Sequence, residues 1–275
     1  MSIRLIVNAD DYARTPEVAR GIRQAHRRGI VTSTTAMMNM PGAGQDLHLA
    51  LGECPRLGLG VHLVLTSGRP LSSPSRVPSL VDGDGNFRPL ERFLAGLDSV
   101  RVGEVEAEWR AQVGRFHAVA DRLPDHLDSH HHSSYFTEDL FRLMLVLARE
   151  YGCPIRLAFA QGSQAGMIGL PAELGGAIAE FAPRLTAEFR PRGPDAFYPS
   201  FYDEQATRPE LIGILDRLPE GTFELMCHPG YVDAALLAGS VYARQREAEL
   251  GILTDPSLKE EVQARRIQLI SFQEL

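Results

Sequence analysis

Residues 57–65 read Leu-Gly-Leu-Gly-Val-His-Leu-Val-Leu, with an apolar side chain at every odd position. Successive side chains of a β-strand point to opposite faces, so the odd positions share one face, which we expect to pack against helices. His62 belongs to the other face, toward the interior, beside Gly58 and Gly60, which leave space around it. His62 is therefore either a functional residue or a core histidine that is hydrogen-bonded to the backbone.

Similar β-rich runs recur along the chain, and segments of helical period separate them. In one such segment Val105, Trp109 and Val113 are spaced so that one stripe faces the core. Strand–helix alternation repeated about eight times predicts a parallel sheet with helical crossovers. We expect a single α/β domain over residues 1–275, a closed or nearly closed (β/α) barrel. Its predicted strands cover residues 4–9, 30–37, 57–65, 126–129, 155–159, 185–189, 222–227 and 267–272.

The segments between the predicted strands carry further signals. No glycine-rich phosphate loop follows the first strand, which argues against a dinucleotide-binding fold. Thr207 and Glu210 are spaced as a capping box at the start of a helix, and Asp255 precedes another helix. Two loop-rich stretches, residues 66–92 and 161–171, are expected as insertions on the rim of the barrel.

Composition excludes several classes of protein. With 44% hydrophobic and 23% charged residues, the chain of 275 residues has a globular composition. Its net charge of -7, from 28 basic and 35 acidic residues, gives no basic surplus for nucleic acid or an anionic membrane. We find no apolar run long enough to span a membrane and no signal peptide, so a cytoplasmic location is expected. The three cysteines are widely separated, which predicts reduced, buried thiols.

Two adjacent carboxylates end the first predicted strand. Asp10 and Asp11 follow residues 4–9, at the carboxyl end of the strand, where barrel enzymes place their catalytic groups. Like charges at this spacing need a counterion. The alternative is that one aspartate caps the following turn while the other is solvated.

The densest cluster of polar residues lies at residues 124–132, Pro-Asp-His-Leu-Asp-Ser-His-His-His, which contain four of the nine histidines. Imidazoles this close together repel one another when protonated and are favoured when neutral and bound to a metal ion. We therefore prefer a metal site to the alternative interpretation, a polar surface loop. His228 ends another strand at the same rim. Cys227 cannot pair with it directly, because neighbours on a strand point to opposite faces, and it is expected to be buried. An Asp–His–His set with open positions for water predicts hydrolytic metal chemistry.

Motifs along nearly the whole chain resemble those of the YdjC-like carbohydrate deacetylases, and most of all the chitooligosaccharide (diacetylchitobiose) deacetylases of that family. The resemblance implies a TIM-barrel-like deacetylase fold, one divalent metal ion held by one Asp and two His, and removal of an N-acetyl group from an amino sugar. It also implies a homodimer. The matching stretches are residues 6–12 (Ile-Val-Asn-Ala-Asp-Asp-Tyr), 29–35 (Gly-Ile-Val-Thr-Ser-Thr-Thr), 60–63 (Gly-Val-His-Leu), 126–132 (His-Leu-Asp-Ser-His-His-His), 226–229 (Met-Cys-His-Pro) and 253–259 (Leu-Thr-Asp-Pro-Ser-Leu-Lys).

Carried over by motif, the resemblance implies Asp11, His62 and His130 as metal ligands and Asp10 as the catalytic base. It also implies Arg156 as a partner of substrate or of a carboxylate. One departure is that Ser133-Ser134 stands where the family commonly has Val-His, which bears on substrate fit.

Three further roles are expected from position on the predicted strands. His228 is our first candidate for the acid that protonates the leaving amine, because it reaches the rim on a different strand, and His132 is the second. We expect Asp128 to orient a metal-bound imidazole through the other ring nitrogen.

Two rival functions stay open from the sequence. A metal-independent glycosidase could use Asp10 or Asp11 with Asp128 as its carboxylate pair. A carbohydrate- or metal-binding barrel without catalysis would also fit these residues. The donor set suits either magnesium or zinc, and the partner is expected to be a small carbohydrate, with no nucleic acid and no membrane span.

Overall fold

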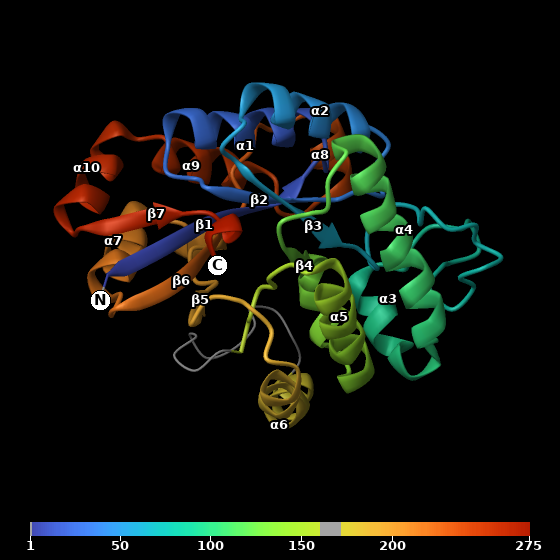
Figure 1. Cartoon of the computed structure of the whole chain (residues 1–275). Coiled ribbons are helices and arrows are strands. Elements are labelled where there is room, and N and C mark those ends of the chain that lie inside the picture. Colours follow the sequence, from blue (N-terminus) through green and yellow to red (C-terminus); the bar gives the residue numbers. More distant parts are fainter. Residues whose placement is uncertain (1, 160–171) are drawn as a thin grey trace.

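A sheet of seven parallel strands forms the centre of the molecule (Figure 1). The structure is a computed structural model, and it describes residues 2–159 and 172–275. The strand order is β4-β3-β2-β1-β6-β5, and β7 pairs with the first half of β1. The strands are β1 (Ile3–Tyr12), β2 (Ser33–Ala36), β3 (Gly58–Leu63), β4 (Leu127–Ser129), β5 (Ala196–Tyr198), β6 (Gly221–Cys227) and β7 (Ile267–Ile270).

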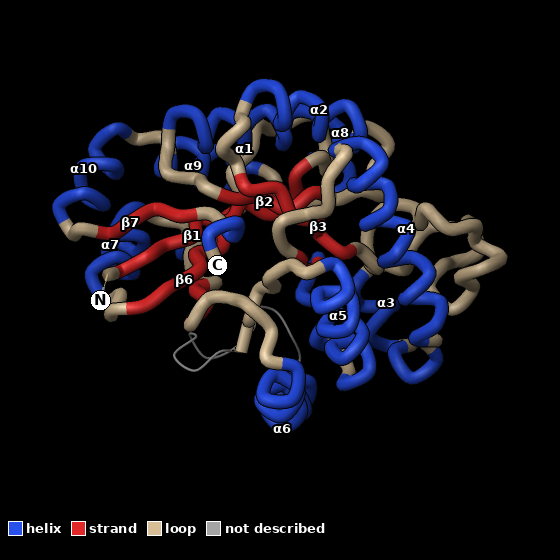
Figure 2. Tube along the Cα trace, viewed as in Figure 1, coloured by secondary structure: helices blue, strands red, loops and turns tan. Residues whose placement is uncertain are grey.

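Helices surround this sheet, as the predicted crossovers require (Figure 2). Among the described residues, no helix is both long and apolar enough to cross a membrane. The α-helices are α1 (Pro16–Arg28), α2 (Ala43–Glu53), α3 (Leu90–Ala95), α4 (Val102–Ala120), α5 (Glu138–Tyr151), α6 (Ala172–Phe189), α7 (Arg208–Arg217), α8 (Ala234–Gly239), α9 (Arg244–Leu253) and α10 (Pro256–Ala264).

The sheet forms a half-barrel, so the predicted α/β barrel-like fold is confirmed, but the barrel is not closed. In the described part of the chain its two end strands, β4 and β5, do not pair with each other. The predicted strand at 155–159 lies between them but forms a single bridge, from Ile155 to Leu127. The amide of Ile155 donates to the carbonyl of Arg192 at 2.9 Å, which is a contact across the gap and not a strand ladder. A barrel seam needs a run of such bonds.

A second predicted strand, at residues 185–189, is the end of helix α6 instead. Ile178, Ala182 and Leu185 are all buried, and their spacing of three or four residues is the helical period. The apolar run was too short to show this period by itself. Strand β5, which has only three residues, was missed for the same reason. The predicted insertion at 161–171 lies outside the described residues.

Both predicted helix starts are present, but the capping box predicted at Thr207 is incomplete. Thr207 accepts a hydrogen bond from the amide of Glu210 at 3.3 Å, but the Glu210 carboxylate accepts from Ser200 at 3.1 Å. Only half of the box is therefore present at α7. Asp255 accepts from the amide of Ser257 at 2.9 Å and caps α10.

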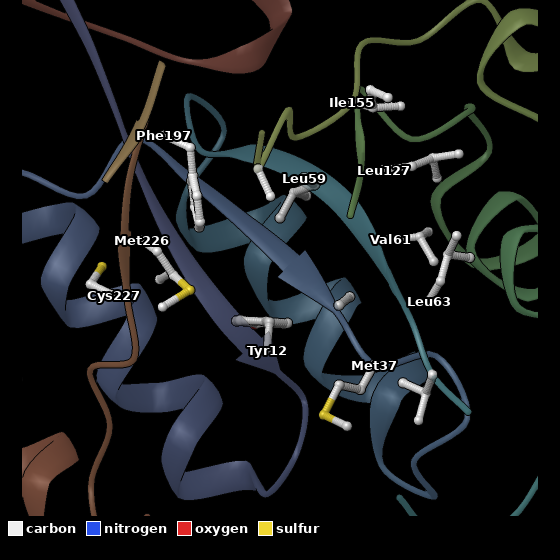
Figure 3. Packing of buried hydrophobic residues seen from close by; sticks show 14 of the residues in the cluster. Tyr12, Met37, Leu59, Val61, Leu63, Leu127, Ile155, Phe197, Met226 and Cys227 are labelled. Atoms are coloured by element: carbon white, nitrogen blue, oxygen red, sulfur yellow. The ribbon is translucent and has the colours of Figure 1, made fainter. Parts of the chain in front are cut away.

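The apolar face of β3 packs as its alternation predicts (Figure 3). Leu59, Val61 and Leu63 are buried in a cluster that also includes Trp109 of α4. The three cysteines are buried free thiols, which confirms their prediction. Because this face of β3 packs against helices, the opposite face, which carries His62, is turned to the interior of the half-barrel.

Candidate active site

The carboxyl ends of several strands meet at one cavity of about 300 Å³. Strand β1 supplies Asp10 and Asp11, β3 supplies His62, and the segments that follow β4 and β6 supply the other histidines. Of the side chains singled out in the sequence, those that line this cavity are Asp10, Asp11, His62, His130, His132 and His228. Asp128 and Arg156 are also buried but do not line it.

Asp11, His62 and His130 bring three ligand atoms together. The Asp11 Oδ1 atom lies 3.0 Å from His130 Nδ1 and 3.5 Å from His62 Nε2, and the two ring nitrogens are 3.3 Å apart. All three residues are buried, and Asp11 Oδ1 forms no hydrogen bond. Ligand atoms at about 2.0–2.2 Å from one cation have roughly these mutual separations. The donor set therefore fits a divalent cation.

The backbone of β1 explains how two neighbouring aspartates reach one cavity. Consecutive strand residues point to opposite faces, which would separate Asp10 from Asp11. The β1–β2 register shifts between Ala9 and Tyr12, and Asp11 has a φ of +67°. An irregularity of this kind re-aims a side chain, and Asp tolerates the left-handed conformation better than most residues. The acid pair is thus placed by a local distortion of the strand.

Arg246 fixes the second oxygen of Asp11. Its Nη2 donates to Asp11 Oδ2 at 2.5 Å, and its Nε donates to the carbonyl of Tyr242 at 3.0 Å. Arg246 is a buried residue of α9, about 235 positions along the chain from Asp11. With Oδ2 held, Oδ1 faces the two imidazoles. The sequence analysis missed Arg246, because an arginine in a charged helix carries no signal of burial.

Asp128 orients the imidazole of His62. The distance from His62 Nδ1 to Asp128 Oδ1 is 2.6 Å, so the Nδ1 proton is donated to the carboxylate and Nε2 keeps its lone pair for a cation. Burial lowers the pKa of His62, but Asp128 raises it, and the net shift is upward. Burial lowers the pKa of His130, although Asp11 opposes that shift. His130 is accordingly favoured as a neutral ligand.

Replacing Asp128 with asparagine is expected to weaken metal affinity or activity by about 10- to 100-fold. The asparagine keeps the shape of the side chain but removes the charge that holds the His62 proton. Titration of the metal-free protein with zinc or magnesium, followed by calorimetry, measures the affinity. Unchanged metal binding and unchanged activity would contradict the role of Asp128.

Arg156 lies at the centre of a buried cluster of carboxylates. Its Nη1 and Nη2 donate to the two oxygens of Asp10, each at 2.7 Å. It also contacts Glu224 at 2.8 Å and Asp128 at 3.1 Å. The structure therefore places Arg156 beside a carboxylate and away from the cavity lining. Glu224, from β6, had no sequence signal beyond lying in an apolar strand.

In this cluster the pKa values of Asp10 and Glu224 are shifted in opposite directions. Burial acts to raise the pKa of Asp10, but the Arg156 guanidinium outweighs it and holds that pKa well below its usual range. Burial raises the pKa of Glu224 to about 7, because Arg156 compensates it less completely. Asp10 is therefore an ionised carboxylate at neutral pH.

His228 and His132 occupy different environments beside Asp10. His228 Nε2 lies 3.9 Å from Asp10 Oδ2, and its ring meets the edges of Tyr202 and Tyr242. Burial lowers the pKa of His228 to about 4 and that of His132 to about 3. Both imidazoles are neutral at pH 7, so either one must gain a proton before it can act as an acid.

The glycines of β3 do not serve to leave space around His62, as the sequence analysis expected. A Cβ on Gly60 would lie 2.6 Å from the ring of His126, and one on Gly58 would lie 2.6 Å from Ser33 Oγ. The glycines thus make room for these two side chains and not for His62. His126 is fully buried and was not singled out among the four neighbouring histidines.

Ser133 and Ser134, where the sequence departs from the resemblance, are both buried and do not line the cavity. Ser134 Oγ accepts a hydrogen bond from Ser129 Oγ at 2.8 Å. These two serines therefore help to hold the segment with His130, His131 and His132 in place.

The fold and the site define an α/β half-barrel protein with a buried Asp–His–His cluster, able to hold a metal ion, at the carboxyl ends of its strands. The chain belongs to the YdjC-like protein family, whose model matches residues 4–264. It is 40% identical to a carbohydrate deacetylase of Brevibacillus brevis, covering 99% of this chain and 100% of that protein. It is 35% identical to a chitooligosaccharide deacetylase of Yersinia pestis, covering 98% of this chain and 97% of that protein.

The architecture also matches a solved structure over its full length. A crystal structure from Enterococcus faecalis, of a candidate cellobiose-phosphate cleavage protein, has a TM-score of 0.85 and 34% identity. The match covers 100% of this chain and 99% of that one. The half-barrel is therefore shared along the whole chain and is not confined to the site.

Proposed function

We propose that this protein is a metal-dependent carbohydrate deacetylase that removes N-acetyl groups from amino sugars such as chito-oligosaccharides. The observation that carries the proposal is the convergence of Asp11, His62 and His130 beside the ionised Asp10 in one cavity. Membership of a family whose curated relatives are named carbohydrate deacetylases supports a hydrolase. An amide is a poor electrophile, so its hydrolysis needs both an activated nucleophile and a stabilised oxyanion.

Asp11, His62 and His130 would hold one divalent cation. When bound, the cation would supply Lewis acidity toward the acetamide carbonyl and toward water. A carboxylate with two imidazoles suits zinc or magnesium, and we propose one such ion without choosing between them. Asp128 and Arg246 fix the orientation of two of these ligands from behind.

Asp10 is proposed as the general base. Its Oδ1 accepts from both Arg156 and Asn8, whereas its Oδ2 accepts from Arg156 and keeps a further lone pair for a proton of water. The low pKa ensures that the base is ionised, at the expense of its proton affinity. Activation of the water is therefore shared with the cation.

His228 is proposed as the donor to the leaving amine, and His132 is the second candidate. A neutral His228 has to receive a proton first. We propose that the proton that Asp10 takes from water passes to His228, whose Nε2 lies 3.9 Å from Asp10 Oδ2, and then to the amine. This sequence returns both residues to their starting states.

The glycosidase alternative has less support from the geometry. The Oδ2 atom of Asp128 contacts Thr35 and Arg156 and its Oδ1 contacts His62, and this residue does not line the cavity. A glycosidase needs both carboxyl groups to face the sugar. The structure offers Asp10 and Asp11 to the cavity, but they are a neighbouring pair on one strand and do not flank a substrate.

The function is tested by measuring acetate release from N-acetylated chito-oligosaccharides on samples of known metal content. We expect release by the metal-replete protein, loss of release after chelation, and recovery when zinc or magnesium is added. The exposed Asp98, changed to asparagine, is a control that keeps full activity. Undiminished release after the metal is removed would refute metal dependence. If metal-replete protein released no acetate, the proposal of deacetylation itself would be wrong.

The cytoplasmic location and the homodimer stay predictions. Light scattering measures the oligomeric state.

A further inference from the structure

A line of polar side chains that do not line the cavity leads to Asp10. Asn8 Nδ2 lies 2.9 Å from Asp10 Oδ1, and Asn8 Oδ1 lies 3.1 Å from His126 Nε2. On the far side of the ring, His126 Nδ1 lies 2.7 Å from Asp125 Oδ1. Asn8 and His126 are fully buried, and neither lines the cavity. None of these three residues has a place in the reaction described above.

The chemistry of the groups fixes the direction of each hydrogen bond. Asn8 Nδ2 donates to the Asp10 oxygen that also accepts from Arg156, so the amide oxygen of Asn8 is the atom that faces His126. His126 Nε2 is then a donor. Asp125 Oδ2 accepts from the amide of Leu59 at 2.6 Å and from Gln273 at 2.8 Å, as an ionised carboxylate does. Its Oδ1 accepts from His126 Nδ1, so in this arrangement His126 donates from both ring nitrogens.

The surroundings of His126 hold its ring in this position. Phe272 stacks on it with ring centroids 3.9 Å apart and an angle of 8° between the planes. Gly60 leaves the space that the ring fills, because a Cβ there would overlap it. The amide of Phe272 donates to Ser33 Oγ at 3.2 Å, and Gln273 holds Asp125. Phe272 and Gln273 thus contact His126 and Asp125, respectively.

We propose that Asp125, His126 and Asn8 form a relay of positioning residues that holds the Oδ1 atom of Asp10 in its working orientation. This inference rests on the proposed function, in which Asp10 is the base. Arg156 contacts both oxygens of Asp10 from one direction, and the relay adds a donor to Oδ1 from another. The carboxylate is then held against rotation. Orientation of a reacting group contributes to the chemical step and not to the affinity for substrate.

The relay is tested by a double-mutant cycle on acetate release by the metal-loaded enzyme. His126→Phe keeps a ring against Phe272 and removes both donors, and Asn8→Ala removes the link to Asp10. Each variant is expected to lower kcat about tenfold, with KM and metal content unchanged. The double variant should be no slower than Asn8→Ala alone, because His126 acts only through Asn8. His117→Phe, at an exposed position of α4, is the matched control and should keep full activity.

Effects of the two substitutions that multiply, or a loss confined to KM or to metal content, would overturn the relay. A second measurement does not depend on the variants folding. The ¹⁵N chemical shifts of His126 in the wild-type, metal-loaded protein should show both ring nitrogens protonated at neutral pH, and a neutral ring would refute the proposed direction of the bonds. A wild-type enzyme that releases no acetate would refute the proposed function instead, so the two failures are distinguishable.

Discussion

The Asp10→Asn enzyme is expected to bind its metal ion normally and to release acetate at least about a hundredfold more slowly than the wild type. Asparagine has nearly the same shape and can still accept from Arg156 through its oxygen, but it cannot take a proton from water. Asp10 contributes no atom to the triad of Asp11, His62 and His130, so the cation should be retained. Metal content and kcat measured on one sample give the two results together.

The neighbouring residue provides the matched control. Asp11→Asn removes the charge from the Oδ1 atom that lies 3.0 Å from His130, and it is expected to lose both metal and activity. Added metal ion at high concentration should restore activity to Asp11→Asn in part and to Asp10→Asn not at all. Comparable rates for wild type and metal-replete Asp10→Asn would exclude Asp10 as the base.

Much of the fold could be predicted because segments with a clear helical period separate its strands. The β3 stretch shows this best, since Leu59, Val61 and Leu63 are buried on the face that its alternation assigned to the helices. The errors fall where a run is short. Residues 185–189 belong to a helix whose period becomes visible only from Ile178 onward. Barrel closure depends on the pairing of distant edges, which no local pattern encodes.

The site residues also divide into those that could be predicted from the sequence and those that could not. The acid pair at 10–11, His62 and the histidines at 130–132 could be singled out because each lies in or near the end of a predicted strand, and the ends of parallel strands meet at one edge. The choice of Asp11, His62 and His130 as ligands came from the family resemblance. Arg246 and Glu224 could not be singled out, because each reaches the site from a distant element and neither is part of a distinctive motif. The irregularity in β1 that brings Asp10 and Asp11 to one cavity is a property of backbone geometry, seen in the β1–β2 register shift and in the φ of +67° at Asp11.

The largest effect on stability is expected from Arg156→Met. Arg156 is 1% exposed and is the shared partner of Asp10, Asp128 and Glu224. Methionine fills much of the same volume but leaves these carboxylates buried without a counterion, at a cost of about 3–5 kcal/mol in the free energy of unfolding. Urea denaturation of both proteins measures the difference. An exposed arginine changed in the same way, Arg101→Met, should alter stability by no more than about 0.5 kcal/mol.

The cause of that loss can be isolated with Glu224. The pKa of this residue is raised to about 7 and that of Asp10 is lowered, so Glu224 becomes neutral more readily than Asp10 does. Adding Glu224→Gln to Arg156→Met removes one uncompensated charge and should restore part of the lost stability, although each change alone is destabilising or neutral. If the two losses simply added, the damage would come from packing and not from charge. Recovery of stability without recovery of acetate release would show that Arg156 is needed twice, once to neutralise the buried carboxylates and once to hold Asp10 for the reaction.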